Sequence, residues 1–405
     1  MPQTPGEEPV TAVQDLLGTD EPRSSTVGAA TALLDAYQPE TDHFFASPTR
    51  TLLAHGIRAR VPHDARPLAA RVRETLEATG DPEALVLGAI PFDQSGPVTL
   101  AVPASVRRAG ALGTDPLLGL PAPAAAPAGW ELRPVPEPPA YAAAVENAVR
   151  RMSAGEFDKV VLARALDVRG AGRPDIPGML QRLARRDPGG YTFAVPSGPG
   201  RTLLGASPEL LLSRRGKRLV TNPLAGSAPR SADLAEDVRR AAALLDSAKD
   251  LREHALVVDA IRAALAPFCT ALDVPERPTL VRTAAMWHLS STLTATVADD
   301  SLSALDLACA LHPTPAVCGA PTRLAREVIR ELEPFDRGLY TGIVGWGDAR
   351  GDGEWVVTIR CAEAGAEGLR LFAGAGVVAD SSPQAETEET EAKFGTFLHA
   401  LGASL

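Results

Sequence analysis

The chain has 405 residues, of which 45% are hydrophobic and 22% charged, and these values are typical of a globular protein with a large buried core. Its formal net charge is −10, and no long Lys/Arg block offsets the acids, which excludes an extended nucleic-acid-binding surface. No apolar run reaches membrane-spanning length and the polar N-terminus lacks the apolar core of a signal peptide, so we expect a cytoplasmic protein without a membrane partner.

The first third of the chain carries no catalytic pattern. Residues 1–20 are rich in Pro, Glu and Thr, and we expect a disordered tail there. Residues 21–112 form a variable part with a strand near Thr51, a helix after Ala65 and a buried strand after Ala84. Residues 113–139 are rich in Pro and Ala, which predicts an extended connector before a core at 140–402.

A lysine lies among apolar residues at the start of this core. Helical spacing of apolar residues after Tyr141 predicts a helix that ends near Gly155. Phe157–Arg164 (FDKVVLAR) predicts a strand that contains Lys159. A lysine in this position either extends its amine to the surface, which is the commoner case, or is held in a dry pocket.

An acid follows at a strand boundary. Strands are predicted at Tyr191–Val195, Thr202–Leu204 and Leu210–Leu212, and Glu209 precedes the last of them. Glu209 is therefore either a carboxyl in a low-dielectric site or the polar end of a strand. The Gly- and Pro-containing segment Val220–Arg230 is predicted to be a loop that supplies backbone amides.

Two further side chains are predicted to point inward. On a helix that starts near Asp250, Glu253 lies on the face of Val257 and Ile261. An unpaired carboxylate is costly to bury, so this placement indicates a cationic partner for Glu253. His288 is interior by alternation in a predicted strand from Met286 to Ser291.

The following elements predict an antiparallel architecture. A loop with two prolines, Leu311–Gly319, precedes a helix that runs to Leu332. Tyr340–Trp346 and Glu354–Cys361 then predict a hairpin across residues 347–353, with Arg360 at the apolar end of its second strand. Since strands come in consecutive groups without βαβ alternation, we predict an α+β fold.

The last segment with a distinctive pattern is Phe372–Lys393, a strand with Gly374 and Gly376 followed by a helix. Glycines in a strand indicate close approach by a ligand or another backbone. Ser382 and the proline after it predict the helix start. Glu386, Glu389 and Lys393 share one helix face, where they are either a site or an ordinary acidic first turn with an i,i+4 ion pair.

Common cofactor and nucleophile motifs are missing from the sequence. The Gly374–Gly376 pair lacks the third glycine and the helix of a dinucleotide loop. Glu253–His254 lacks the second His of a zinc-protease helix, and the four cysteines lack zinc-ligand spacing. Neither a GxSxG elbow nor a P-loop is present.

Taken in order, these segments resemble the chorismate-utilising enzymes, and most closely the isochorismate synthases of siderophore pathways. The segments that carry the resemblance are FDKVVLAR (157–164), GASPELLL (205–212), PLAGSA (223–228), EH (253–254), WHL (287–289), LHPTPAVCG (311–319), ELEPFDRGLYTGIVGW (331–346), GEWVVTIRCA (353–362) and LFAGAGVVADSSPQAETEET (371–390). They cover about the last two thirds of the chain, whereas the first part resembles the family loosely.

The resemblance implies a fold and a site. The fold is α+β, with two packed, largely antiparallel sheets and helices outside, and residues 21–405 would form one large unit that acts as a monomer. Lys159 matches the lysine that activates water and Glu209 matches the opposing acid. Glu253, Glu386 and Glu389 match the Mg²⁺ carboxylates. The remaining matches are chorismate-binding positions: Gly226, Ser227, His288, Ala316, Tyr340, Arg360, Gly374 and Lys393.

The implied reaction suits these residue types. Isochorismate forms when water adds to C2 of the chorismate ring and the C4 hydroxyl departs, which needs a base and an acid on opposite faces. Arg360 would offer a planar fork for a substrate carboxylate. Family members that use ammonia lack Lys at position 159, so Lys159 favours water as the nucleophile.

Two alternatives remain within this interpretation. A salicylate synthase, which also expels pyruvate, is compatible with Tyr340, although Ala316-Val317 resembles the enzymes that stop at isochorismate. A non-catalytic chorismate-binding paralogue would have lost Lys159, Glu209, Glu253 or Glu389, and the sequence keeps all four.

Overall fold

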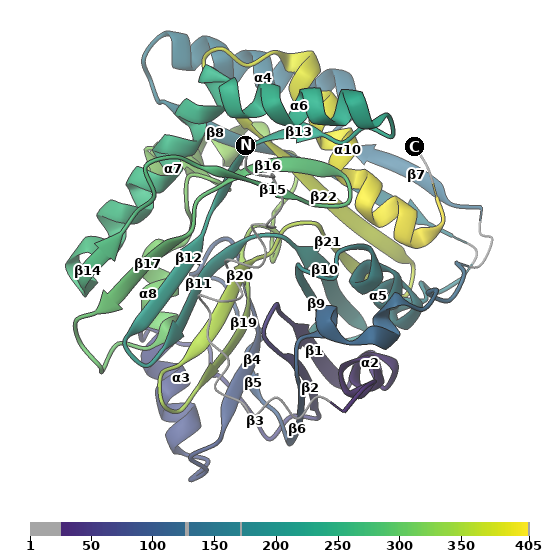
Figure 1. Ribbon diagram of the computed structural model, residues 1–405, viewed down its shortest axis with the longest axis vertical. Helices are drawn as coiled ribbons and strands as arrows, with labels where there is room; N and C mark the ends of the chain where they lie inside the picture. Colours follow the sequence, from purple (N-terminus) through teal and green to yellow (C-terminus); the bar gives the residue numbers. More distant parts are fainter. Residues whose placement is uncertain (1–25, 126–128, 171, 404–405) are drawn as a thin grey trace, which may run out of the picture.

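The computed structural model describes residues 26–125, 129–170 and 172–403, and two large sheets form its centre (Figure 1). The tail expected at residues 1–20 lies outside this part of the chain. Every strand pair in the described residues is antiparallel, which confirms the predicted α+β class. A third, three-stranded sheet was not expected.

The first sheet has ten strands. In spatial order they are β18 (Gly319–Ala320), β8 (Lys159–Arg169), β22 (Gly368–Val377), β21 (Cys361–Gly365), β10 (Arg201–Ser207), β9 (Tyr191–Gly198), β1 (Asp42–Ala46), β2 (Thr51–His55) and β6 (Ser105–Ala109), with β7 (Glu131–Val135) paired to β8. Side chains of β8 alternate, so that Ala163 and Ala165 face the second sheet while Leu166 and Val168 face the outer helices.

The second sheet has nine strands and the third has three. The second contains β14 (Cys269–Asp273), β17 (Leu293–Val297), β12 (Arg218–Asn222), β11 (Leu210–Arg215), β20 (Gly353–Val357), β19 (Ile343–Asp348), β4 (Leu85–Ile90), β5 (Ala101–Val102) and β3 (Ala59–Arg60). The third contains β13 (Leu224–Pro229), β16 (Met286–Ser290) and β15 (Thr279–Arg282). Apolar side chains of the two large sheets form a shared core between them.

Helices cover the outer faces of the sheets. The first sheet is covered by α2 (Ala29–Asp35), α4 (Pro138–Ser153), α5 (Ile176–Arg186), α9 (Thr322–Leu332) and α10 (Pro383–Leu401). The second is covered by α3 (Leu68–Glu77), α7 (Ala248–Leu265) and α8 (Ala304–Leu311), and the third by α6 (Leu234–Asp246) with α7. Short 3-10 turns are η1 (Leu112–Thr114), η2 (Pro116–Gly119) and η3 (Ala266–Phe268). Figure 1 shows α4, α6 and α10 at one end of the molecule, beside the third sheet.

Several local expectations were wrong. The stretch 113–139 is not an extended connector throughout, because β7 pairs with β8 and α4 begins at Pro138. Val220–Arg230 forms the end of β12 and all of β13 rather than a loop. Tyr340 and Arg360 lie just outside β19 and β20. The helix start predicted at Ser382 and the proline after it is confirmed, because Ser382 is the N-cap of α10, although its side chain makes no capping hydrogen bond.

Candidate active site

A cavity lies where the three sheets meet helices α7 and α10. Eleven of the predicted site residues line it: Glu209, Gly226, Ser227, Glu253, His288, Ala316, Tyr340, Arg360, Gly374, Glu389 and Lys393. The predicted residues Lys159 and Glu386 lie behind this lining. Lys159 contacts Glu253 of the lining, and Glu386 contacts Lys249 of the lining.

Lys159 is fully buried at the start of β8. Its Nζ lies 2.8 Å from Oε1 of Glu253, which is 7% exposed on the apolar face of α7. The cationic partner expected for Glu253 is therefore Lys159. A Cβ on Gly376 of β22 would come within 2.2 Å of Glu253 Oε1 and 3.2 Å of Lys159 Cε, so a glycine is needed for this pair to form.

Glu209 lies in the turn between β10 and β11, and only 3% of it is exposed. Burial raises the pKa of its carboxyl to about 8, although a backbone hydrogen bond from Leu224 and the charges of Lys159 and Lys393 oppose the shift. The carboxyl therefore holds its proton at neutral pH and can act as an acid.

Arg360 is buried in the cavity wall with a positive φ of 49°. Its Nη2 donates to His288 Nε2 at 3.3 Å. Burial and the charges of Arg360 and Lys393 lower the pKa of His288 well below its ordinary value, so the imidazole is neutral and can accept this bond. The guanidinium is thus oriented by β16 before any ligand arrives.

The segment Tyr340–Thr341 forms another part of the wall. The Tyr340 ring stacks on Phe372, with centroids 4.9 Å apart and planes at 10°. Thr341 also has a positive φ, of 56°, and such strained backbone persists only where neighbours hold it. Here His312 Nε2 donates to the Thr341 carbonyl at 2.8 Å. Burial lowers the pKa of His312 to about 4, which keeps that ring neutral.

Helix α10 brings Glu386, Glu389 and Lys393 to one side, as predicted, and each acid has a lysine partner. Glu389 Oε1 accepts from Lys393 Nζ at 2.5 Å and from Ser227 Oγ at 2.9 Å, while Glu386 Oε1 accepts from Lys249 Nζ at 2.8 Å. Burial alone would raise the pKa of Glu389, but Lys393 and Ser227 hold it below its ordinary value. Burial and the neighbouring Glu389 charge raise the pKa of Glu386.

Two of the three predicted metal-binding acids are placed where they could hold a hard divalent cation. Across the described residues, no three His, Cys, Asp or Glu side chains are grouped as a ready metal centre. Glu253 from α7 and Glu389 from α10 nevertheless both line the cavity. Mg²⁺ is commonly held by one or two carboxylates, with waters and a ligand completing its shell, so this donor pair fits it. Glu386 faces Lys249 instead of the cavity lining.

Sequence reasoning missed several residues of the wall. Lys249 and Asp250 line the cavity one turn before Glu253, and Phe372 and Thr341 also line it. The i,i+4 spacing of Lys249 and Glu253 was a usable signal, because it places both on one helix face. Phe372 shares a strand face with Gly374 and Gly376 by alternation, which was also a usable signal, whereas no local pattern identifies Thr341.

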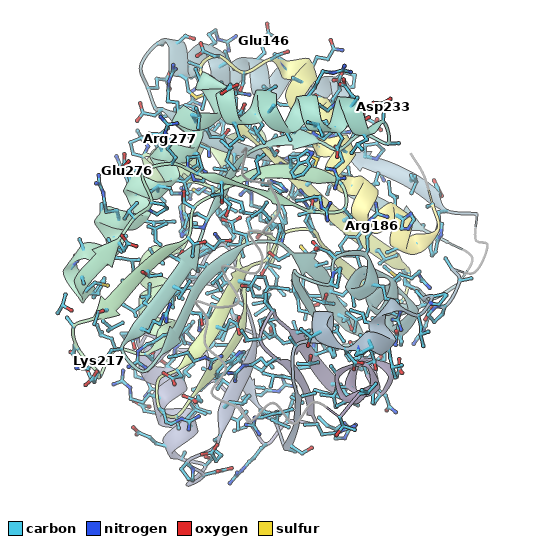
Figure 2. The ribbon with its side chains drawn as sticks, in the orientation of Figure 1. Glu146, Arg186, Lys217, Asp233, Glu276 and Arg277 are labelled. Atoms are coloured by element: carbon cyan, nitrogen blue, oxygen red, sulfur yellow. The ribbon has the colours of Figure 1, made fainter. Side chains whose placement is uncertain are left out.

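Charges elsewhere on the molecule are mostly solvated. The labelled side chains of Glu146, Lys217 and Glu276 lie at the outer rim in Figure 2, away from the cavity described above. In the part of the chain that the structure describes, no helix is both long and apolar enough to cross a bilayer.

Comparison with known proteins gives consistent likenesses. Residues 122–402 match the chorismate binding enzyme family. The isochorismate synthase DhbC of Bacillus subtilis (strain 168) is 51% identical over an alignment 386 residues long, which covers 91% of this chain and 96% of the relative. The vibriobactin-specific isochorismate synthase of Vibrio cholerae serotype O1 is 41% identical over an alignment 380 residues long, which covers 92% of this chain and 94% of the relative.

A solved structure shows the same fold. The crystal structure of DhbC from Bacillus anthracis matches with a TM-score of 0.86 and 46% identity, and covers 92% of this chain and 99% of that one. The likeness therefore extends well beyond the motifs of the last two thirds and includes the part that sequence motifs matched only loosely.

Proposed function

Since this chain belongs to the family of chorismate binding enzymes, we propose that it is an isochorismate synthase, an isomerase that converts chorismate to isochorismate. The observation that supports this most directly is one cavity that has the buried amine of Lys159 directly behind its wall and, in its lining, the Glu209 carboxyl, which keeps its proton. Its similarity to DhbC and to the vibriobactin-specific enzyme supports a role in siderophore-type biosynthesis.

The reaction needs one proton removed and one supplied. In our proposal the Lys159 amine, in its neutral form, takes a proton from the water that attacks C2 of the ring. Glu209 gives its proton to the C4 hydroxyl, which leaves as water. One water enters and one leaves, so the substrate is isomerised without a redox change. Glu253, at 2.8 Å from Lys159 Nζ, orients the amine.

The substrate carboxylates would be held by cations of the wall. Arg360 presents a guanidinium that His288 already orients, and a planar fork binds a carboxylate through two parallel hydrogen bonds. Because its position is fixed in advance, little side-chain freedom is lost when the ligand binds. Lys393 supplies a second positive charge in the same cavity.

We propose that Mg²⁺ is the cofactor and that Glu253 and Glu389 hold it, with Glu386 supporting Glu389 from the same helix face. When bound, the ion would neutralise charge on the ring carboxylate of the substrate. Lys159 contacts Glu253 and Lys393 contacts Glu389 in the structure described above, so binding of the ion would require each lysine to give up part of its contact with its acid.

The two alternatives are less well supported. A non-catalytic paralogue would keep Lys159 and Glu209 buried without using them, and unused buried charge is expensive. Tyr340 is compatible with a salicylate synthase as well, so the products of the reaction distinguish that activity from isochorismate synthesis. The relatives named above are isochorismate synthases.

Product analysis tests the proposal. The purified chain is incubated with chorismate and Mg²⁺, and products are separated by chromatography. Isochorismate is expected as the main product, and a chelator should abolish its formation until Mg²⁺ is restored. Salicylate with pyruvate as the main products, or no turnover at all, would contradict the proposal, and full activity in chelator would contradict the metal assignment.

A further inference from the structure

A buried ion pair that the reaction itself does not use lies directly behind the cavity wall. Glu333 and Arg337 follow α9 at i,i+4, and they are 9% and 3% exposed. Arg337 Nε donates to Glu333 Oε2 at 2.8 Å, and its Nη2 donates to Oε1 at 2.5 Å. Burying an ion pair gives little stability by itself, because desolvation offsets the attraction between the charges. We therefore ask which other groups the ion pair of Glu333 and Arg337 contacts.

The remaining donors of Arg337 reach three separate segments. Its Nη2 donates to the Val161 carbonyl of β8 at 2.7 Å, and its Nη1 donates to the Val317 carbonyl at 2.8 Å. The same Nη1 donates to Thr341 Oγ1 at 3.2 Å. With the two bonds to Glu333, these interactions use all five N–H groups that a guanidinium has. A lysine, with three donors and no fork, could not make the same set.

The pair also completes an edge of the first sheet. β18 pairs with β8 only at Lys159 and Val160, and β7 pairs with β8 only from Ala165 onward. In the gap between them, the Val161 carbonyl is bound by Arg337, and the Ala163 N–H donates to Glu333 Oε1 at 2.8 Å. The two side chains thus take the place of a neighbouring strand.

The three segments that Arg337 joins are walls of the cavity. Val161, Val317 and Thr341 all line it. Val161 is two residues from Lys159 on the same strand, so both side chains point to one face. Thr341 is the strained residue beside Tyr340, and its hydroxyl also donates to the Tyr340 carbonyl at 2.6 Å.

We propose that Arg337 is a positioning residue: held by Glu333, it fixes the strand that carries Lys159 relative to the Ala316–Val317 loop and to Tyr340. This inference rests on the proposed isochorismate synthase activity. Arg337 touches no substrate in this proposal and acts through the placement of Lys159 against the opposite wall. A small displacement between reacting groups is enough to slow an enzyme strongly while binding persists.

The test compares Arg337→Lys with Arg214→Lys. Arg214 is also 3% exposed, and it binds the Asp352 carboxylate and the carbonyls of Arg350 and Asp300, none of which lines the cavity. Both variants lose a buried guanidinium, so both report the structural cost of that loss. For each folded variant, kcat and KM for chorismate are measured with Mg²⁺, together with the thermal shift that chorismate produces.

Arg337→Lys should lower kcat by at least about tenfold, with a much smaller change in KM and a retained thermal shift, whereas Arg214→Lys should keep wild-type kinetics. Equal kinetics of the two variants, or a rise in KM at unchanged kcat, would overturn the positioning role. If Arg337→Lys does not fold, Glu333→Gln is measured in its place, and the same changes in kcat, KM and thermal shift are expected of it. Failure of the proposed function is distinguished by the wild-type protein, which would then form no isochorismate.

Discussion

In the proposed reaction Glu209 gives a proton and Lys159 takes one, and the surroundings of the two side chains differ. Glu209 is enclosed between two strands, and burial makes ionisation of its carboxyl unfavourable. Lys159 is equally buried but has a carboxylate at 2.8 Å.

The raised pKa of Glu209 predicts a pH dependence. The proton-donating form dominates below a pKa of about 8 and is lost as the pH rises through that value. We therefore expect kcat to fall with increasing pH above about 8, as measured by isochorismate formation at saturating chorismate. Glu209→Gln, which cannot donate an acidic proton, should be inactive across the range. A profile that stays flat well above pH 8 in the wild-type protein would argue against Glu209 as the acid.

Replacement of Lys159 by Met should abolish turnover, because the base that activates water is lost, with a fall in kcat of at least about 10²-fold. Chorismate binding should persist, since Arg360 and Lys393 remain in the cavity. Calorimetric titration measures binding and chromatography measures turnover. The matched control is Lys217→Met, because the Lys217 side chain is 61% exposed and its ion pair with Asp300 lies at the surface.

Turnover by Lys159→Met close to that of the control variant would refute the role of Lys159. Circular dichroism checks that the variant is folded, which is necessary because removal of one partner of a buried ion pair costs about 3–5 kcal/mol.

At the residue scale, sequence reasoning named eleven residues that the structure places around one cavity, and it identified fewer of the contacts that hold them. The inward face of Glu253 could be predicted, because helical periodicity fixes direction. Burial of Lys159 could not be decided, since the same local sequence suits a lysine that extends to solvent. The positive φ values of Thr341 and Arg360 were not predictable either, because neither is a glycine and long-range contacts hold both.

At the scale of elements, the site depends on how closely β22 approaches α7. Gly376 permits this approach, because any larger residue would collide with the Glu253 carboxylate. Gly374 likewise permits the Tyr340 hydroxyl to lie close to β22, because a Cβ at this position would lie 2.8 Å from the hydroxyl oxygen. The sequence predicted a close approach at these glycines, but it could not say which element would approach.

Gly376→Ala is expected to displace Glu253 from Lys159 and to lower kcat while the fold is kept. Gly395→Ala is the control, since a Cβ there meets nothing within 4 Å and its helical position should gain about 0.5–1 kcal/mol of stability. Steady-state kinetics and thermal unfolding of both variants provide the measurement. An active site unaffected by Gly376→Ala would show that the Lys159–Glu253 contact is not required.

Element prediction succeeded where the pattern was local. The long helices and buried strands appear at their predicted places, because periodic apolar residues specify them. The stretches that failed were Val220–Arg230 and 113–139, where Gly and Pro suggested loops. In both, pairing with a distant strand decided the outcome: β13 pairs with β16, and β7 with β8. Such non-local pairing leaves no mark in one sequence.

At the scale of the whole molecule, the cavity belongs to no single layer. Gly374 comes from the first sheet, Glu209 from a turn that leads into the second, Ser227 from the third, and Glu389 from a C-terminal helix. Residues from Val161 to Lys393 meet there. A ligand that touches all of these elements binds only when they are assembled together.

Chorismate with Mg²⁺ should therefore stabilise the entire fold and not one part of it. The Lys159→Met variant is suited to this measurement, because it does not consume the ligand. At a chorismate concentration of 100 times its Kd, binding should add about 2.7 kcal/mol to the free energy of unfolding. Calorimetry or circular dichroism should show the main unfolding transition moving to higher temperature as a unit, and Arg360→Ala should reduce the shift, since it removes the guanidinium proposed to hold a carboxylate. A transition that splits, with only one part responding to the ligand, would mean that the sheets unfold independently and that the cavity is not shared among them.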